Sequence, residues 1–131
     1  MKIAIIISRL LLGAGFIIFG LNILYPFMPM PPPPEGSLTQ QYMMVMIPTH
    51  WMALVGIFQL LGGILVILGR TAPLGLVCLG PVLVNILAFH ILITEGQGIA
   101  PGLVFSGLEI FLIYAYRSYF SGLFTTEASP S

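Results

Sequence analysis

Charged residues are scarce in this chain: four Lys or Arg and four Asp or Glu make up 6% of its 131 residues. A soluble domain carries about 25% charged residues, so this chain has too few to cover a water-facing surface. Hydrophobic residues make up 58% of the sequence, and the mean hydropathy is +1.08. The composition predicts an integral membrane protein, and the length allows one domain, residues 1–131.

Cysteine is nearly absent as well. Cys78 is the only one, which excludes an internal disulfide, a redox pair and a cysteine-rich metal site. The net charge is zero, and no basic patch suggests a nucleic-acid partner. Because the sequence also has no phosphate-binding glycine loop, nucleophile elbow or zinc-ligand spacing, we expect no metal and no resident cofactor, and no catalytic residue can be assigned.

Long apolar runs are abundant. A transmembrane helix needs about 20 residues, and four segments reach or approach that length: residues 3–24, 50–68, 72–94 and 99–116. Short links join the last three, so consecutive helices must be antiparallel neighbours. The predicted fold is an all-α membrane protein: a four-transmembrane-helix antiparallel bundle with a Pro-rich outer loop and a short interfacial helix. We interpret the first run as a retained helix, because it is longer than the apolar region of a signal peptide.

Basic residues predict the orientation. With four spans, one side of the membrane receives Lys2, Arg9, Arg70 and Arg117, and the other receives Glu35 and Glu95. The positive-inside rule then places both termini in the cytoplasm, with the chain in the cell (inner) membrane.

The outer loop, residues 25–49, is rich in proline and favours a stiff extended segment. Ser37 and Gln40 have the spacing of a capping box, which predicts a short helix at the membrane surface, closed by Pro48. A short C-terminal tail, residues 118–131, follows the last span.

Polar residues within the spans are candidates for function, because they are costly in lipid. Helical periodicity places Arg9, Gln59, Asn85 and Glu109 on faces that meet other helices. We predict that they form a buried polar network built on an Arg9–Glu109 ion pair. Two hypotheses remain open: the network fixes helix register, or Glu109 titrates in a proton or quinol site.

A second set lies near the outer end: Asn22, His50 and His90. These side chains are possible ligand or quinone contacts. Haem is not expected, because paired ligation needs facing histidines on rigid helices and His50 follows Pro48 at a helix start. A histidine bonded to loop backbone is the alternative interpretation.

Several short motifs follow one another in order along the chain. They are RLLLG at 9–13, FGLN at 19–22, MPMPP at 28–32, LLGG at 60–63, GR at 69–70, GPVLVNILAFH at 80–90, Glu109, and AYR at 115–117. In this order the chain resembles the DoxX-like family of small four-helix membrane proteins. Gln59 is a departure, because many relatives have a glutamate there, and an amide cannot titrate.

The resemblance implies a modest function. The family takes its name from a subunit of an archaeal thiosulfate:quinone oxidoreductase, and other members look like accessory parts of redox or receptor-assembly systems. We expect a non-catalytic accessory subunit or assembly factor, with the lipid bilayer, subunits of a membrane redox complex or a second copy as partners. A quinone-linked oxidoreductase component and a small transporter or proton-conducting protein are the alternatives.

Overall fold

The computed structural model describes residues 1–131 and is all-helical, with no strands. Its α-helices are α1 (Lys2–Leu24), α2 (Leu38–Met46), α3 (Trp51–Leu68), α4 (Ala72–Leu92) and α5 (Ala100–Ala115). Two short 3₁₀ helices follow, η1 (Arg117–Tyr119) and η2 (Ser121–Phe124). The helices α1, α3 and α4 are long and apolar enough to cross a membrane, whereas α5 is apolar but has only 16 residues.

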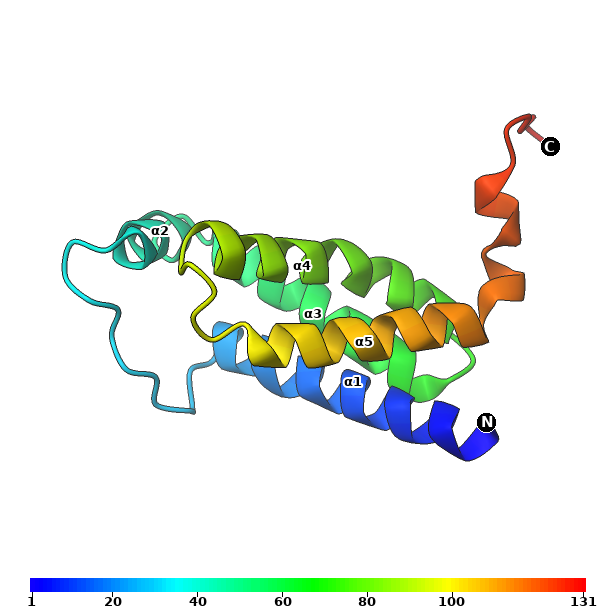
Figure 1. The fold of residues 1–131 in the computed structure, drawn as a ribbon, viewed down its shortest axis with the longest axis horizontal. Coiled ribbons are helices and arrows are strands. Elements are labelled where there is room, and N and C mark those ends of the chain that lie inside the picture. Colours follow the sequence, from blue (N-terminus) through cyan, green and yellow to red (C-terminus); the bar gives the residue numbers. More distant parts are fainter.

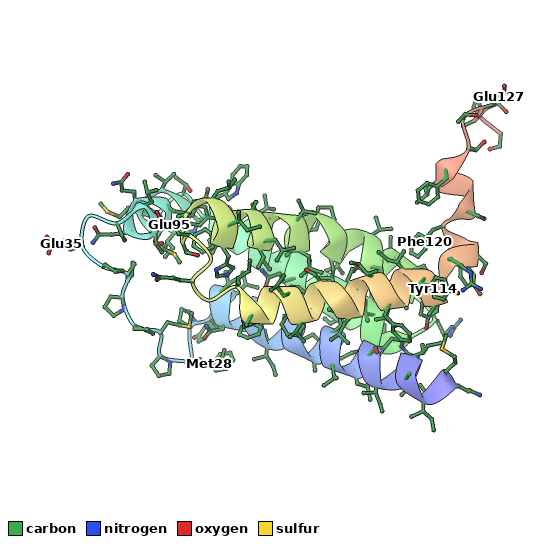
Figure 2. All side chains as sticks on the ribbon, in the orientation of Figure 1. Met28, Glu35, Glu95, Tyr114, Phe120 and Glu127 are labelled. Atoms are coloured by element: carbon green, nitrogen blue, oxygen red, sulfur yellow. The ribbon has the colours of Figure 1, made fainter.

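The helices α1, α3, α4 and α5 lie alongside one another (Figure 1). Contacts join α1 to α3, α3 to α4, α4 to α5, and α5 back to α1. The N-terminus and the end of α5 lie together at one end, which we call the terminal end; the long loop and α2 lie at the other, the loop end. Figure 2 shows Glu35 and Glu95 at the loop end, and Tyr114 and Phe120 at the terminal end.

Glycine allows α1 and α3 to touch backbone to backbone. A Cβ atom at Gly63 would lie 2.7 Å from the Gly13 carbonyl oxygen, and one at Gly20 would lie 2.9 Å from the Gly56 carbonyl oxygen. Contacts this short exclude any side chain, and small residues of this kind are what let membrane helices approach closely. The antiparallel register of α1 and α3 is set by these two pairs.

A hydrophobic core fills the middle of the bundle and its terminal half. Its fully buried members come from α1, α3, α4 and α5: Leu12, Phe16, Val66, Leu76, Leu79 and Leu112. Phe120, just beyond η1, closes this cluster at the terminal end. The loop half lacks a comparable cluster; the cavity described below lies there, and the cleft described below runs from there to the middle of the bundle.

The predicted cap of the short helix is confirmed. The Ser37 hydroxyl accepts a hydrogen bond from the Gln40 amide at 3.1 Å. The Gln40 side chain accepts from the Gly36 N–H at 2.7 Å, one residue earlier than in the standard capping box, because the Ser37 N–H donates to the Pro34 carbonyl. The ring centroid of Tyr42 lies 4.7 Å from that of Phe89 in a tilted contact, which packs α2 against α4.

Candidate functional site

The predicted ion pair between Arg9 and Glu109 is wrong. The Arg9 guanidinium donates to the Val66 carbonyl at 3.1 Å and to the Ile67 carbonyl at 2.9 Å, while neither oxygen of Glu109 has a hydrogen-bond partner. Arg9 therefore binds the end of α3, not the acid on α5.

The physical reason lies in the orphan carbonyls of α3. The last four carbonyl groups of a helix have no partner within it, and in lipid each must find one. Arg9 serves two of them, of which the Val66 carbonyl also accepts from the Gly69 N–H at 3.2 Å. The Thr71 hydroxyl donates to a third, the Leu65 carbonyl, at 2.7 Å. Gly69, with φ of 77°, provides the space: a Cβ there would lie 2.6 Å from the guanidinium. A cation at a helix C-terminus also complements the helix dipole.

Glu109 stands alone in the interior. It is 4% exposed, and the Ser106 hydroxyl one turn earlier on α5 is also buried without a partner. An unpaired polar group in an apolar interior costs stability. The burial of Glu109 is therefore not explained by any interaction within the chain.

We expect Glu109→Leu to raise the free energy of unfolding by about 1–3 kcal/mol, because it removes a buried group that nothing satisfies. Thermal unfolding in a mild detergent measures the change, with Glu35→Leu in the exposed loop as a control that should change little. Combined with Arg9→Met the effects should add, since the two side chains do not touch. If Glu109→Leu instead lowers the free energy of unfolding, the Glu109 carboxyl must have a partner that stabilises it.

A cavity of about 420 Å³ lies among the loop-end halves of α1, α3, α4 and α5. Three of the predicted residues line it: Asn22 from α1, Gln59 from α3 and His90 from α4. The remaining lining is apolar and includes Met30 from the Pro-rich loop. The sequence placed Gln59 in one polar set and the other two in another; the structure brings the three together.

Three phenyl rings give this cavity an aromatic wall. The ring centroid of Phe105 lies 5.3 Å from that of Phe16 and 6.1 Å from that of Phe19. Glu109 lies about 6 Å further along α5 than Phe105, at 1.5 Å per residue, and does not line the cavity. The rings therefore stand between the cavity and the isolated acid.

Two of the three polar groups are already partly bonded. The Asn22 side-chain oxygen accepts from the Phe27 and Met28 N–H groups at 3.0 and 2.9 Å, which turns the outer loop back over α1. His90 Nδ1 lies 3.0 Å from the Gln97 carbonyl, so this histidine does bond loop backbone. Because a carbonyl only accepts, Nδ1 donates in this contact, and Nε2 is the ring nitrogen without a partner in the chain.

His50 lies apart from this set. It is the exposed residue before α3, with φ of 62°, and it lines neither the cavity nor the cleft described next. The structure therefore does not bring His50 together with Asn22 and His90.

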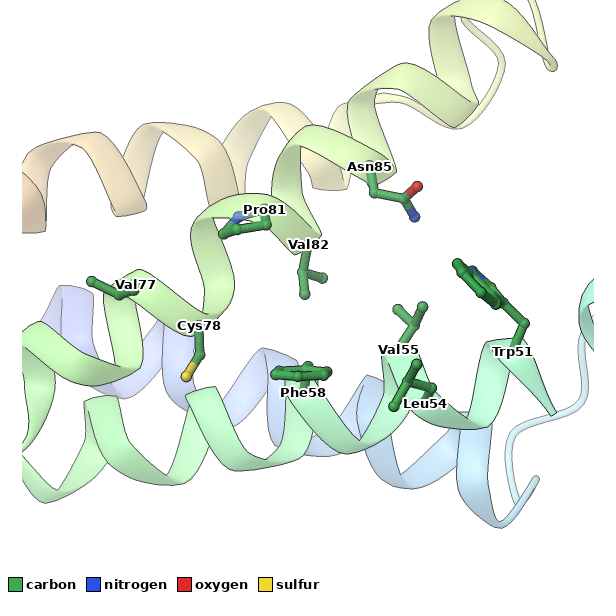
Figure 3. A pocket seen from close by; sticks show the side chains of 9 residues that line it. All are labelled: Trp51, Leu54, Val55, Phe58, Val77, Cys78, Pro81, Val82 and Asn85. Atoms are coloured by element: carbon green, nitrogen blue, oxygen red, sulfur yellow. The ribbon is translucent and has the colours of Figure 1, made fainter.

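Asn85 faces outward. It is exposed, and it lines a cleft of about 480 Å³ between α3 and α4. Figure 3 shows its amide and the ring of Trp51 on opposite sides of this cleft, with Phe58 and Cys78 deeper along it. Pro81 lies within α4; an internal proline removes a backbone hydrogen bond and bends a helix, and beyond it α4 diverges from α3 (Figure 3).

The four residues of the predicted network thus occupy four separate places: the end of α3, the cavity, the outward cleft and the apolar interior. Sequence reasoning missed the cleft, although a proline in the middle of a span was a signal for it. It also missed the roles of Gly69 and Thr71 around Arg9. The only indication of them was that α3 ends here and leaves carbonyl groups without partners.

Comparison with known families gives a match over most of the bundle. A family model described as DoxX matches residues 4–91, which takes in α1, α2, α3 and nearly all of α4. No curated protein and no solved structure matches the chain.

Proposed function

The chain belongs to the DoxX family, and from this premise we propose that it is a non-catalytic accessory subunit or assembly factor of a membrane complex such as a redox complex. The single observation that supports this role is the outward cleft with the exposed amide of Asn85.

The proposal includes a membrane arrangement. The helices α1, α3, α4 and α5 span the bilayer as an antiparallel bundle, and α2 lies at the outer surface. The basic residues of the terminal end, Lys2, Arg9, Arg70 and Arg117, favour placing that end in the cytoplasm of a cell (inner) membrane.

In this arrangement Asn85 lies within the hydrocarbon region. At 1.5 Å per residue it is about 20 Å from the start of α4 and about 10 Å from its end, too far for a short amide side chain to reach water. It forms no hydrogen bond within the chain, and no internal helix covers it. Lipid tails offer such an amide no partner, so its exposure carries a cost.

A transmembrane helix from another subunit would remove that cost. Polar side chains such as asparagine hydrogen-bond across helices in membranes, each contributing about 0.6–2 kcal/mol. The cleft provides room beside the amide and an apolar surface on both walls. We therefore assign the cleft to a partner helix that presents a hydrogen-bonding residue at the depth of Asn85.

The test compares complexes purified in gentle detergent from the protein's own membranes. Asn85→Leu should lose a stoichiometric partner that the wild type retains. Val84→Leu, on a neighbouring side chain that is 68% exposed and lies outside the cleft, should retain it. Mass spectrometry and light scattering give the identity and stoichiometry. A partner retained by Asn85→Leu would refute this docking site, and loss of a second copy of the same chain would replace the subunit role with a homo-oligomer.

A quinone-linked oxidoreductase component is the second candidate, and the specific observation in its favour is the cavity shared by Asn22, Gln59 and His90. This candidate is tested by extracting the small molecules that co-purify with the chain and identifying them by mass spectrometry. Quinone at one equivalent per chain would favour it over the accessory role.

A transporter or proton-conducting protein is less well supported. It would need a polar route from the loop end to the terminal end, and the cavity meets Phe16 and Phe105 on that path. Beyond them lie the buried leucines of the core.

A further inference from the structure

We propose that the cavity lined by Gln59 binds a small, flat, largely apolar ring compound that carries a carbonyl or hydroxyl oxygen, and that the Gln59 amide is the polar contact for that oxygen. This inference deepens the second candidate function, which rests on the same cavity, and it holds whether or not the protein joins a complex.

Gln59 is the first reason. It is 4% exposed, its side-chain oxygen is buried without a partner, and it lines the cavity from α3. A buried amide normally has its hydrogen bonds satisfied. A rotation of the amide by half a turn exchanges its oxygen and nitrogen, so Gln59 offers either an acceptor or a donor to a molecule in the cavity.

The shape of the wall is the second reason. Phe16, Phe19 and Phe105 all line the cavity, and the ring of Phe105 contacts the other two. Aromatic rings favour stacked or edge-on contacts with other rings. A flat ring compound therefore fits this wall better than a branched or extended chain does.

The size of the cavity is the third reason. A volume of about 420 Å³ falls in the range of small-molecule sites, about 300–1,000 Å³, which are mostly apolar with a few placed polar groups. Gln59, His90 and the free amide nitrogen of Asn22 are such groups here. Aromatic ketones, phenols and quinones share the chemistry that this combination would recognise.

The experiment compares two probes of nearly the same shape in protein reconstituted into lipid nanodiscs. 1-Naphthol carries one hydroxyl oxygen on a flat bicyclic ring, and naphthalene carries none. Calorimetric titration, corrected with empty nanodiscs, should show 1-naphthol binding on the order of fivefold more tightly than naphthalene, the value of one net hydrogen bond. Asn85→Leu, outside the cavity, should leave both affinities unchanged.

Gln59→Leu should abolish the preference for 1-naphthol while retaining naphthalene binding, which shows that the cavity is intact. If Gln59→Leu does not fold, Gln59→Met keeps the length of the side chain and removes the amide. Equal affinities for both probes in the wild type, no binding of either, or a preference that survives in the variant would each overturn the proposal. None of these outcomes bears on the partner lost by Asn85→Leu, so the two proposals fail independently.

Discussion

Gly63→Leu is expected to separate α1 from α3 and to lower the free energy of unfolding by roughly 3 kcal/mol or more. Even the first atom of a side chain at Gly63 would lie 2.7 Å from the Gly13 carbonyl oxygen and 3.1 Å from the Ile17 backbone nitrogen. Backbone atoms cannot rotate out of the way, and overpacking alone costs about 1–3 kcal/mol. The lost contacts along the helix pair add to that cost.

Gly107→Leu on α5 is the matched control. No atom lies within 4 Å of a Cβ at that position, and leucine is the better helix former. Its stability should equal or slightly exceed that of the wild type. Thermal unfolding in detergent, followed by the fluorescence of Trp51, measures both variants. A Gly63→Leu protein that melts with the wild type would show that α1 and α3 are not in backbone contact.

Arg9→Met is expected to lower the free energy of unfolding by roughly 2–4 kcal/mol, because hydrogen bonds to charged groups contribute about 1.5–3 kcal/mol each. Methionine fills much of the same space but leaves the Ile67 carbonyl without its donor. The last turn of α3 should then fray, which hydrogen exchange of its amides would detect.

Arg70→Met separates the lost hydrogen bonds from the lost charge. Arg70 lies two residues beyond the end of α3, is exposed and forms no side-chain hydrogen bond, so its replacement should change stability little. Arg9→Lys should recover part of the loss, since a single ammonium cannot match the fork of a guanidinium. Equal effects of Arg9→Met and Arg70→Met would show that charge alone matters.

The positions of the helices were predictable because the residues of each helix determine where it begins and ends. Apolar runs of spanning length gave α1, α3 and α4, and Ser37 with Gln40 gave the start of α2. Prolines near the starts of α4 and α5 gave their first turns. These signals depend on a helix's own residues, so they survive without knowledge of its neighbours.

The partners of the polar residues were not predictable in the same way. Helical periodicity indicated which face of α1 carries Arg9. The opposite charge of Glu109 then suggested the wrong partner, because the true acceptors are backbone carbonyls, which every residue has and no sequence pattern marks. Likewise, helical periodicity placed Asn85 on a face that meets other helices, yet the divergence of α4 from α3 beyond Pro81 leaves Asn85 exposed in the cleft. Asn85 and His90 lie five residues apart on α4, which is about 140° around a helix, and the structure accordingly has them lining different spaces.

The shortness of α5 affects the bilayer itself. Its 16 residues extend about 24 Å, against about 34 Å for the 23 residues of α1, while the hydrocarbon layer is about 30 Å thick. When α5 spans the bilayer, either the bilayer beside it must become thinner or another protein must cover the helix. The bilayer beside α1 needs no such change. Such one-sided mismatch costs fractions of a kcal/mol per Å. The protein would therefore settle with α5 toward thinner lipid patches, and the membrane would help to orient it.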